Sequence, residues 1–529
     1  MKLDLTTGTY ELVKAEQSYV TEPCFCLEHV LYITKPLMPE YQYLKVWIPQ
    51  AYVNEEESAI NWEAEVNGYT PRSCPIIFRN NCTGWFSSNP ENEVENRQGI
   101  NDFMRNGYVL VVCGARSRNA VKNGINYGKA PSPLVDLKAG LRFLRANKDV
   151  LPGNTDRIFS IGGSGAGQMS AALAATGDMK DYYPYLYALG AAGVEKTEDG
   201  KYVSSISDCV YACQAYYPIT DIDNADIAYA WMRVRTGEKG FSARFPFPQD
   251  VTFTPFQLEL QKDEADAFVR YLNSLGLKDS DGNILRLESL RSGSYYAAIL
   301  NNISVALNAY LAELEDPSVY VDKLLATNKP GKTWVVKLNN GKLKVTDLDL
   351  FIANSGNRGD ATTLGTCFLR NKDIPGFDTL ALSAENNAFG RVDEPAVHYS
   401  ATVAKVLKDN YEKYLSLMTE EEKAQADLWI EQALDNRFLE YQTYLVDPLE
   451  ILLNRKAGKE QTVPAEHWRI RSGTADEHTS FSIGFNLALS LIANGLDTDY
   501  SLVWAMIHGD EAEGTSTGTF VGWVESLRG

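Results

Sequence analysis

The stretch Arg157-Ile-Phe-Ser-Ile-Gly-Gly-Ser-Gly-Ala-Gly-Gln-Met-Ser170 joins a short apolar run, four glycines around Ser164 and a segment of small helix-forming residues. This order predicts a buried strand, a tight turn and a helix. A serine at such a turn is a candidate nucleophile, because the following helix N-terminus points backbone N–H groups at developing negative charge. Small neighbours are needed there, since the strained turn brings strand and helix close together.

The glycine pattern leaves two other interpretations open. Ala166 stands where the usual G-x-S-x-G pattern has its last glycine, and Gly167 follows one place later. The stretch could be a glycine-rich loop after a core strand, or a phosphate-binding turn. The second is disfavoured because Gln168 occupies the place of the third glycine of G-x-G-x-x-G counted from Gly163, and no Lys-Ser or Lys-Thr follows.

The composition is that of a globular protein, with 529 residues, 44% of them hydrophobic and 11% aromatic. This length predicts a core domain of about 250–300 residues with a large insertion or a second domain. The net charge of −19 argues against nucleic acid or an anionic membrane as partner. No apolar run is long enough for a transmembrane helix. The eight cysteines lack zinc-type C-x-x-C spacing and are interpreted as reduced, mostly buried thiols.

The beginning of the sequence, Met1 to Leu12, contains no apolar leader segment. The absence of such a segment predicts a cytoplasmic location.

Apolar segments alternate with helical ones in the first part of the chain. The apolar segments are Pro75–Phe78, Tyr108–Cys113, Ile158–Ile161 and Val210–Pro218. This alternation predicts a mostly parallel α/β sheet. It stops after Pro218 and resumes near the C-terminus, where Trp468–Gly473 and Ser501–Ile507 have the pattern of strands.

We therefore expect three regions: a first part of the α/β core over 1–220, an inserted and mainly helical lid domain over 221–445, and a second part of the core over 446–529. Ligands of such sheets bind at the carboxyl ends of the strands. The insertion is therefore expected to cover that edge.

A serine nucleophile requires a base within hydrogen-bonding reach and a carboxylate that orients the base. The five histidines are His29, His398, His467, His478 and His508. In α/β folds with the nucleophile at such a turn, the chain order is serine, acid, histidine. Asp476 follows the penultimate predicted strand and His508 the last one, so we expect both to meet Ser164 at one edge of the sheet.

Each of the two partners also has a plainer interpretation. His508 could be a strand-end histidine that bonds only to backbone, and Asp476 could cap the helix that follows it.

An oxyanion hole would combine the backbone N–H of Gly165 with one from the loop after Phe78. Thr83 and Gly84 are the candidates for this second donor. Asn80, Asn81 and Cys82 are equally well placed by the sequence, so the choice stays open.

Several longer stretches carry a family resemblance. They are Arg157–Gly167, Val345–Leu350, Ile374–Asp378, Glu385–Gly390 and His467–Phe481. In these stretches the chain resembles the bacterial tannases of the α/β-hydrolase superfamily, a group with feruloyl-esterase-like relatives. The resemblance implies an α/β-hydrolase fold and serine esterase chemistry with Ser164, Asp476 and His508 as the triad. It implies no metal and no organic cofactor.

The resemblance also implies where the acyl group would bind. In such tannases a lysine and a glutamate of the lid hydrogen-bond the hydroxyls of the galloyl ring, and Lys372 and Glu385 fall on the matching motifs. The two could instead form an exposed ion pair. A third contact in that family is an aspartate two residues past the triad acid, where this chain has His478. A neutral histidine donates or accepts but carries no fixed charge, so galloyl, hydroxycinnamoyl and smaller acyl groups all remain candidates.

The expected partner is a small phenolic ester, and the expected assembly is a monomer or a small homo-oligomer. Two other functions stay open: a serine peptidase on the same fold, and a non-catalytic binding protein on a hydrolase fold.

Overall fold

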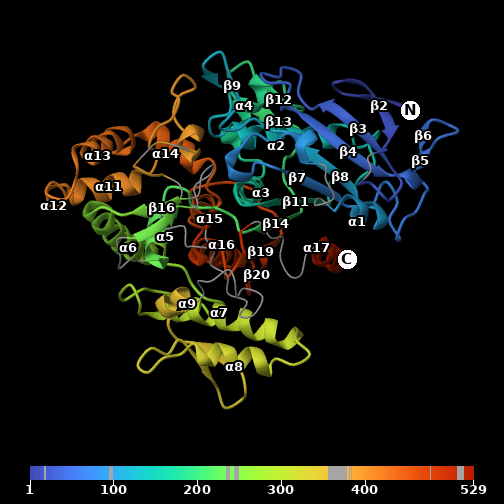
Figure 1. The fold of residues 1–529 in the computed structure, drawn as a ribbon. Coiled ribbons are helices and arrows are strands. Elements are labelled where there is room, and N and C mark those ends of the chain that lie inside the picture. The colour runs from blue at the N-terminus through green and yellow to red at the C-terminus, as the bar shows by residue number, and fades with distance from the viewer. Residues whose placement is uncertain are drawn as a thin grey trace.

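The computed structural model describes residues 1–16, 19–93, 99–233, 239–242, 249–354, 378–380, 382, 384–476, 478–508 and 517–528. A ten-stranded sheet forms its centre (Figure 1). In spatial order its strands are β1 (Lys2–Leu5), β2 (Gly8–Lys14), β3 (Cys24–Leu31), β4 (Tyr43–Pro49), β8 (Val109–Cys113), β7 (Ile76–Asn80), β11 (Ile158–Gly163), β14 (Ala212–Tyr216), β19 (His467–Gly473) and β20 (Asp497–Val503).

The six strands from β8 to β20 run parallel to one another, and the four at the other edge pair antiparallel. The register places Ser160 of β11 opposite Phe78 of β7 and Cys213 of β14. Strands β7, β8 and β14 are buried along their whole length, and β8 is accordingly a continuous apolar run in the sequence. The prediction of a mostly parallel α/β sheet is confirmed.

Helices cover both faces of the sheet. Helices α1 (Ile100–Arg105) and α17 (Thr517–Ser526) pack together on one face, where Phe520 of α17 contacts the rings of Phe103 and Phe159. The other face carries α2 (Ser132–Ala146), α3 (Gly165–Ala175), α15 (Pro448–Lys456) and α16 (Phe481–Ala493). Beyond α2 lie α4 (Tyr183–Ala188) and the hairpin of β12 (Val194–Lys196) with β13 (Tyr202–Ser204). Two smaller hairpins are β5 (Val53–Asn54) with β6 (Ala59–Ile60), and β9 (Val121–Lys122) with β10 (Ile125–Asn126).

Between β14 and β19 the described chain is mainly helical and adds no strand to the large sheet. One group lies beside the sheet in Figure 1: α5 (Ala225–Met232), α6 (Pro255–Leu275), α11 (Ala401–Asp409), α12 (Tyr411–Tyr414), α13 (Glu420–Ala433) and α14 (Arg437–Tyr444). A second group projects at the bottom of the view: α7 (Ser294–Glu313), α8 (Ser318–Ala326) and α9 (Leu348–Asn354). Two hairpins accompany them, β15 (Lys239–Ser242) with β16 (Gln249–Thr252), and β17 (Val335–Lys337) with β18 (Leu343–Val345). The division into a two-part core and an inserted lid stays a prediction.

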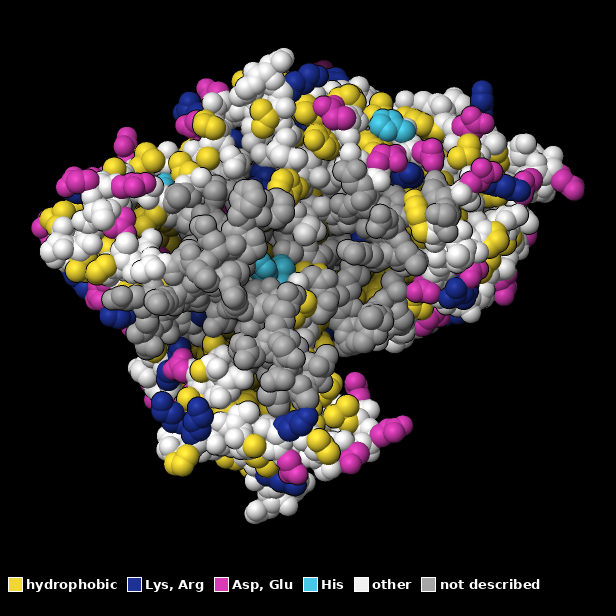
Figure 2. Space-filling view, viewed as in Figure 1, with side chains coloured by type: hydrophobic (Ala, Val, Ile, Leu, Met, Phe, Trp, Pro, Cys, Tyr) yellow, Lys and Arg dark blue, Asp and Glu magenta, His cyan; other side chains and the backbone are white. Residues whose placement is uncertain are grey.

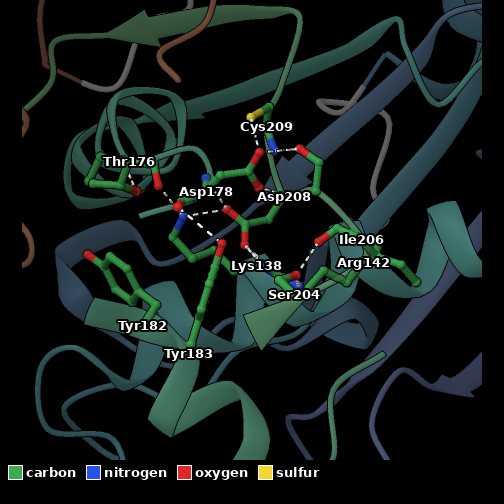
Figure 3. Close-up of polar contacts among 12 residues, drawn as sticks. Lys138, Arg142, Thr176, Asp178, Tyr182, Tyr183, Ser204, Ile206, Asp208 and Cys209 are labelled. Atoms are coloured by element: carbon green, nitrogen blue, oxygen red, sulfur yellow. Dashed lines mark hydrogen bonds and ion pairs between the residues drawn. The ribbon is translucent and has the colours of Figure 1, made fainter. Parts of the chain in front are cut away.

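A buried polar cluster fastens α2 to the end of α3 (Figure 3). The Lys138 ammonium donates to the carbonyl of Thr176, which ends α3, at 2.6 Å and forms an ion pair with Asp208 at 2.7 Å. Arg142 pairs with the other oxygen of Asp208 at 2.6 Å. Burial alone would raise the pKa of Asp208, but the attraction of the two cations outweighs it and the pKa lies below its usual value. The cluster therefore holds a charged carboxylate in the interior.

On the face shown in Figure 2, the described acidic and basic side chains are interspersed. No described helix combines the length and the apolar character that a membrane crossing requires. Seven cysteines lie in the described residues, and all of them are free thiols.

Candidate active site

Ser164 stands between the end of β11 and the first residue of α3. Its backbone has φ 60° and ψ −127°, a strained conformation for a residue with a side chain, and its N–H donates to the carbonyl of Tyr216 at 3.1 Å. A Cβ built on Gly162 would overlap the carbonyl oxygen of Ala166. Strand, tight turn and helix thus follow one another as the sequence predicts, and the glycine is required by close approach.

Asp476 lies in the loop between β19 and α16 and is 1% exposed. Its Oδ1 accepts the backbone N–H of His478 at 2.7 Å and that of Thr479 at 3.2 Å. The N-cap of α16 is Ser480, whose side chain accepts from the N–H of Ser482. Asp476 therefore closes the turn before the helix rather than capping the helix itself.

His508 lies between these two side chains. Its Nδ1 is 3.0 Å from each oxygen of Asp476, and its Nε2 is 2.8 Å from Oγ of Ser164. The structure thus brings together the three residues that the sequence singles out, in an unbroken chain of hydrogen bonds.

The expected last strand over Ser501–Ile507 is wrong in its bounds. β20 runs from Asp497 to Val503, so His508 stands 508 − 503 = 5 residues past the strand. The chain turns at Ala505, which has φ 65° and donates its N–H to the side chain of Thr474. The carbonyl of Met506 then accepts the N–H of Ala475, which fastens this turn to the loop that carries Asp476.

The surroundings of Asp476 keep its carboxyl charged. Burial raises its pKa, but the charge and hydrogen bond of His508, with smaller contributions from His478, more than offset this, and the pKa lies below its usual value. Two further rings flank His508: Tyr217 and His478 each lie 4.6 Å from it, measured between ring centroids.

The expected oxyanion loop forms the short 3₁₀ turn η2 (Thr83–Trp85), which packs against the start of α3. A Cβ built on Gly165 would lie 2.8 Å from the carbonyl oxygen of Cys82 and 2.9 Å from the nitrogen of Trp85. The turn and the helix N-terminus are therefore in direct contact, with no room for a side chain between them.

Backbone hydrogen bonds narrow the choice of the second donor. The N–H of Asn81 donates to the side chain of Ser88, and that of Cys82 donates to the side chain of Asn80. Within the described residues, the N–H groups of Thr83 and Gly84 have no acceptor. Because a free N–H is what an oxyanion needs, these two remain the candidates.

The residues expected to bind the acyl group fall in different places. Lys372 lies outside the described residues. Glu385 is half-buried in η7 (Ala384–Ala388), which packs on η2, and nearby the rings of Trp85 and Phe389 are 5.5 Å apart. The ring of His478 lies against His508. Glu385 therefore lies on an element that packs on the candidate oxyanion loop, and His478 lies beside the candidate base.

Arg118 links Glu385 to the candidate oxyanion loop. Its Nε donates to the carbonyl of Gly84 at 2.7 Å, and its guanidinium stacks 3.8 Å from the ring centroid of Phe86. Burial lowers the pKa of Arg118, and the nearby charge of Glu385 opposes this shift.

Two neighbours of the site were not expected from the sequence. Tyr217 directly follows the end of β14, and its place after an apolar strand is a signal that could have found it. Arg233 at the end of α5 donates to the backbone of Asp476 at 2.8 Å, and no sequence pattern marks it. In the described part of the chain, no group of three or more His, Cys, Asp or Glu side chains is arranged to hold a metal ion.

Known proteins resemble this chain at two levels. Residues 67–238 match the BD-FAE family model. Over its whole length the chain resembles the tannin acyl hydrolase of Lactobacillus plantarum, with 26% identity, a TM-score of 0.74, and 98% of this chain and 97% of that chain covered. A tannin acyl hydrolase in complex with ethyl gallate matches with 27% identity and a TM-score of 0.73 over 98% and 97% of the two chains. The chain is a tannase-like carboxylic ester hydrolase.

The tannase of Fusobacterium nucleatum has the same fold, with a TM-score of 0.75 at 24% identity over 98% of both chains. No curated protein gives a significant match. These matches confirm the α/β-hydrolase fold, the likeness to bacterial tannases and the expected carboxylic ester hydrolase.

Proposed function

We propose that this tannase-like chain is a serine esterase that hydrolyses phenolic acid esters through an acyl-enzyme. The observation that carries the proposal is the hydrogen-bond chain from Ser164 through His508 to Asp476. Each group has the partner that the chemistry requires: a hydroxyl on a strained turn, an imidazole within 2.8 Å of it, and a buried carboxylate on the far side of the imidazole.

In the first half-reaction, Oγ of Ser164 attacks the ester carbonyl and Nε2 of His508 takes the hydroxyl proton. The negative charge then develops on the carbonyl oxygen, where the N–H of Gly165 and an N–H of Thr83 or Gly84 would stabilise it. The imidazolium returns the proton to the leaving alcohol, and an acyl-serine ester remains. Water then repeats the attack with His508 as base, which releases the acid and restores the Ser164 hydroxyl.

The substrate class rests on one solved relative and on the place of Glu385. The solved relative bound to ethyl gallate is a tannin acyl hydrolase, and this chain has Glu385 half-buried beside η2. A half-buried carboxylate accepts hydrogen bonds from phenolic hydroxyls, which favours an aromatic acyl group with at least one free hydroxyl. The ring of His478 offers a neutral donor or acceptor near His508.

A fluorophosphonate probe tests the chemistry. Wild-type protein should form a covalent adduct at Ser164, and Ser164→Ala should form none while keeping its fold by circular dichroism. Equal labelling of the two proteins would exclude the serine mechanism and favour a non-catalytic hydrolase fold.

A substrate panel then ranks the acyl group: methyl gallate, methyl ferulate, p-nitrophenyl acetate and a chromogenic peptide. We expect the phenolic esters to be turned over and the peptide to be left intact. Glu385→Gln should lower kcat/KM for methyl gallate more than for p-nitrophenyl acetate. If the peptide were turned over faster than every ester, the chain would be assigned as a serine peptidase and not as an esterase.

A further inference from the structure

Arg233, the C-cap residue of helix α5, contacts the loop that carries Asp476, the candidate catalytic acid. Arg233 follows α5, within residues 221–445, and is 5% exposed. Its Nη2 donates to the backbone carbonyl of Asp476 at 2.8 Å, although the two residues are 243 positions apart in the chain. We infer that Arg233 is a positioning residue for Asp476, an inference that rests on the proposed esterase function.

The neighbour of Arg233 makes a second link to the same loop. The sulfur of Met232 accepts the N–H of Phe481, the first residue of α16, at 3.3 Å. The last residue of α5 and its C-cap thus contact Asp476 and Phe481, which lie on either side of His478 in the chain.

Helix α5 is itself held firmly at this end. Gln261 of α6 donates to the carbonyl of Arg233 at 3.2 Å. On the other side, Arg291 donates to the carbonyl of Trp231 at 2.9 Å and pairs with Asp349. Because this end of α5 is hydrogen-bonded on two sides, Arg233 is held in place where it contacts the loop of Asp476.

The contact matters because the orientation of Asp476 decides what His508 can do. The carboxylate receives two backbone N–H groups and Nδ1 of His508, so a tilt of the loop would move both oxygens relative to the imidazole. The buried carbonyl of Asp476 needs a donor, and a guanidinium is a strong one. Misplacing a catalytic group by about 1 Å can lower the rate about 100-fold.

The test compares Arg233→Met, Arg233→Lys and the matched control Arg291→Met in the full-length protein. Arg291 anchors the same end of α5, but within the described residues none of its hydrogen bonds reaches the acid loop. The rates are measured with p-nitrophenyl acetate at neutral pH, with the fold checked by circular dichroism. We expect Arg233→Met to lower kcat about 10- to 100-fold with KM nearly unchanged, a split that a general loss of stability would not produce.

Arg233→Lys should recover most of kcat, because it keeps a charged donor. Arg291→Met should lose much less of kcat than Arg233→Met, because Arg233 keeps its own hydrogen bond to Asp476. The inference is overturned if folded Arg233→Met keeps kcat, or if Arg291→Met loses as much as Arg233→Met. If Arg233→Met does not fold, Arg233→Gln takes its place under the same criteria.

The outcome separates this inference from the proposed function. If wild-type protein fails to label at Ser164 and turns over no ester, the esterase proposal fails. If wild-type protein is active and the Arg233 variants are indistinguishable from it, only the positioning role fails.

Discussion

Replacing Asp476 by asparagine changes one atom of the candidate triad and should reverse the tautomer of His508. In the wild type, Oδ1 accepts the N–H groups of His478 and Thr479, while Nδ1 of His508 lies 3.0 Å from each oxygen. In Asp476→Asn, the amide oxygen must take the Oδ1 position, because only an oxygen can accept those two N–H groups. The amide NH₂ then faces Nδ1 of His508.

An NH₂ group donates, so Nδ1 must become the acceptor and the ring proton moves to Nε2. Nε2 would then carry a hydrogen toward Ser164, 2.8 Å away, and could no longer accept the hydroxyl proton. The expected loss is in kcat, about 10⁴-fold, as for a triad whose histidine is held in the wrong tautomer. KM should change little, since the carboxylate does not face the substrate.

Steady-state hydrolysis of p-nitrophenyl acetate at neutral pH measures this loss, and circular dichroism verifies the fold. Asp497→Asn is the matched control: Asp497 pairs with Nδ1 of His467 at 2.7 Å, a second carboxylate–histidine contact, at the other end of β19 and β20. The control should keep wild-type activity. If Asp476→Asn retained more than about a tenth of the wild-type kcat, the carboxylate would not be setting the tautomer and the reasoning would be refuted.

Three further outcomes are expected. Gly165→Ala should lower kcat about 10- to 100-fold, because its Cβ would push η2 away from the start of α3, whereas Gly522→Ala, with open space at its Cβ, should not. Asp208→Asn should lower the free energy of unfolding in urea by about 3–5 kcal/mol, since it leaves two buried cations unpaired, whereas Asp199→Asn at a surface pair should leave it unchanged. Burial raises the pKa of Asp221 to about 7. Between about pH 4 and about pH 7 the native state therefore keeps a proton on Asp221 that the unfolded chain has released. The contribution of Asp221 to the free energy of unfolding thus falls as the pH rises through this range. Asp221→Asn should therefore stabilise the protein by about 4 kcal/mol more at about pH 8 than at about pH 4, measured by urea unfolding at both.

The centre of the sheet was predictable because its inner parallel strands are buried on both faces. A strand such as Val109–Cys113 is then apolar at every position, and its short length between turns favours a strand over a helix. The antiparallel edge is harder to read, because β1 and β2 alternate and are largely exposed. Their pairing depends on contacts with β3 that no local pattern contains.

The candidate site was predictable where a residue type is rare or its turn is constrained. Five histidines limit the choice of base, and the glycines around Ser164 reflect a close approach that the structure contains. The contact from Arg233 to a backbone carbonyl could not be found this way. Every residue has a backbone carbonyl, so the acceptor of this hydrogen bond cannot be recognised in the sequence. Arginine is also too frequent for its presence to indicate such a contact.

The position of His508 follows from the spacing of the strands. Ser164 follows β11, Tyr217 follows β14, Asp476 follows β19 and His508 follows β20, so four adjacent parallel strands each contribute one residue. Neighbouring strands lie about 4.8 Å apart, which puts the ends of β11 and β20 about 14 Å from each other. A histidine at the very end of β20 could not reach Ser164 with its side chain. The chain must first return across two strands, and the five residues after Val503, with their left-handed turn at Ala505, supply that path. Tyr217, at the end of the intervening strand, then lies under the imidazole where it arrives.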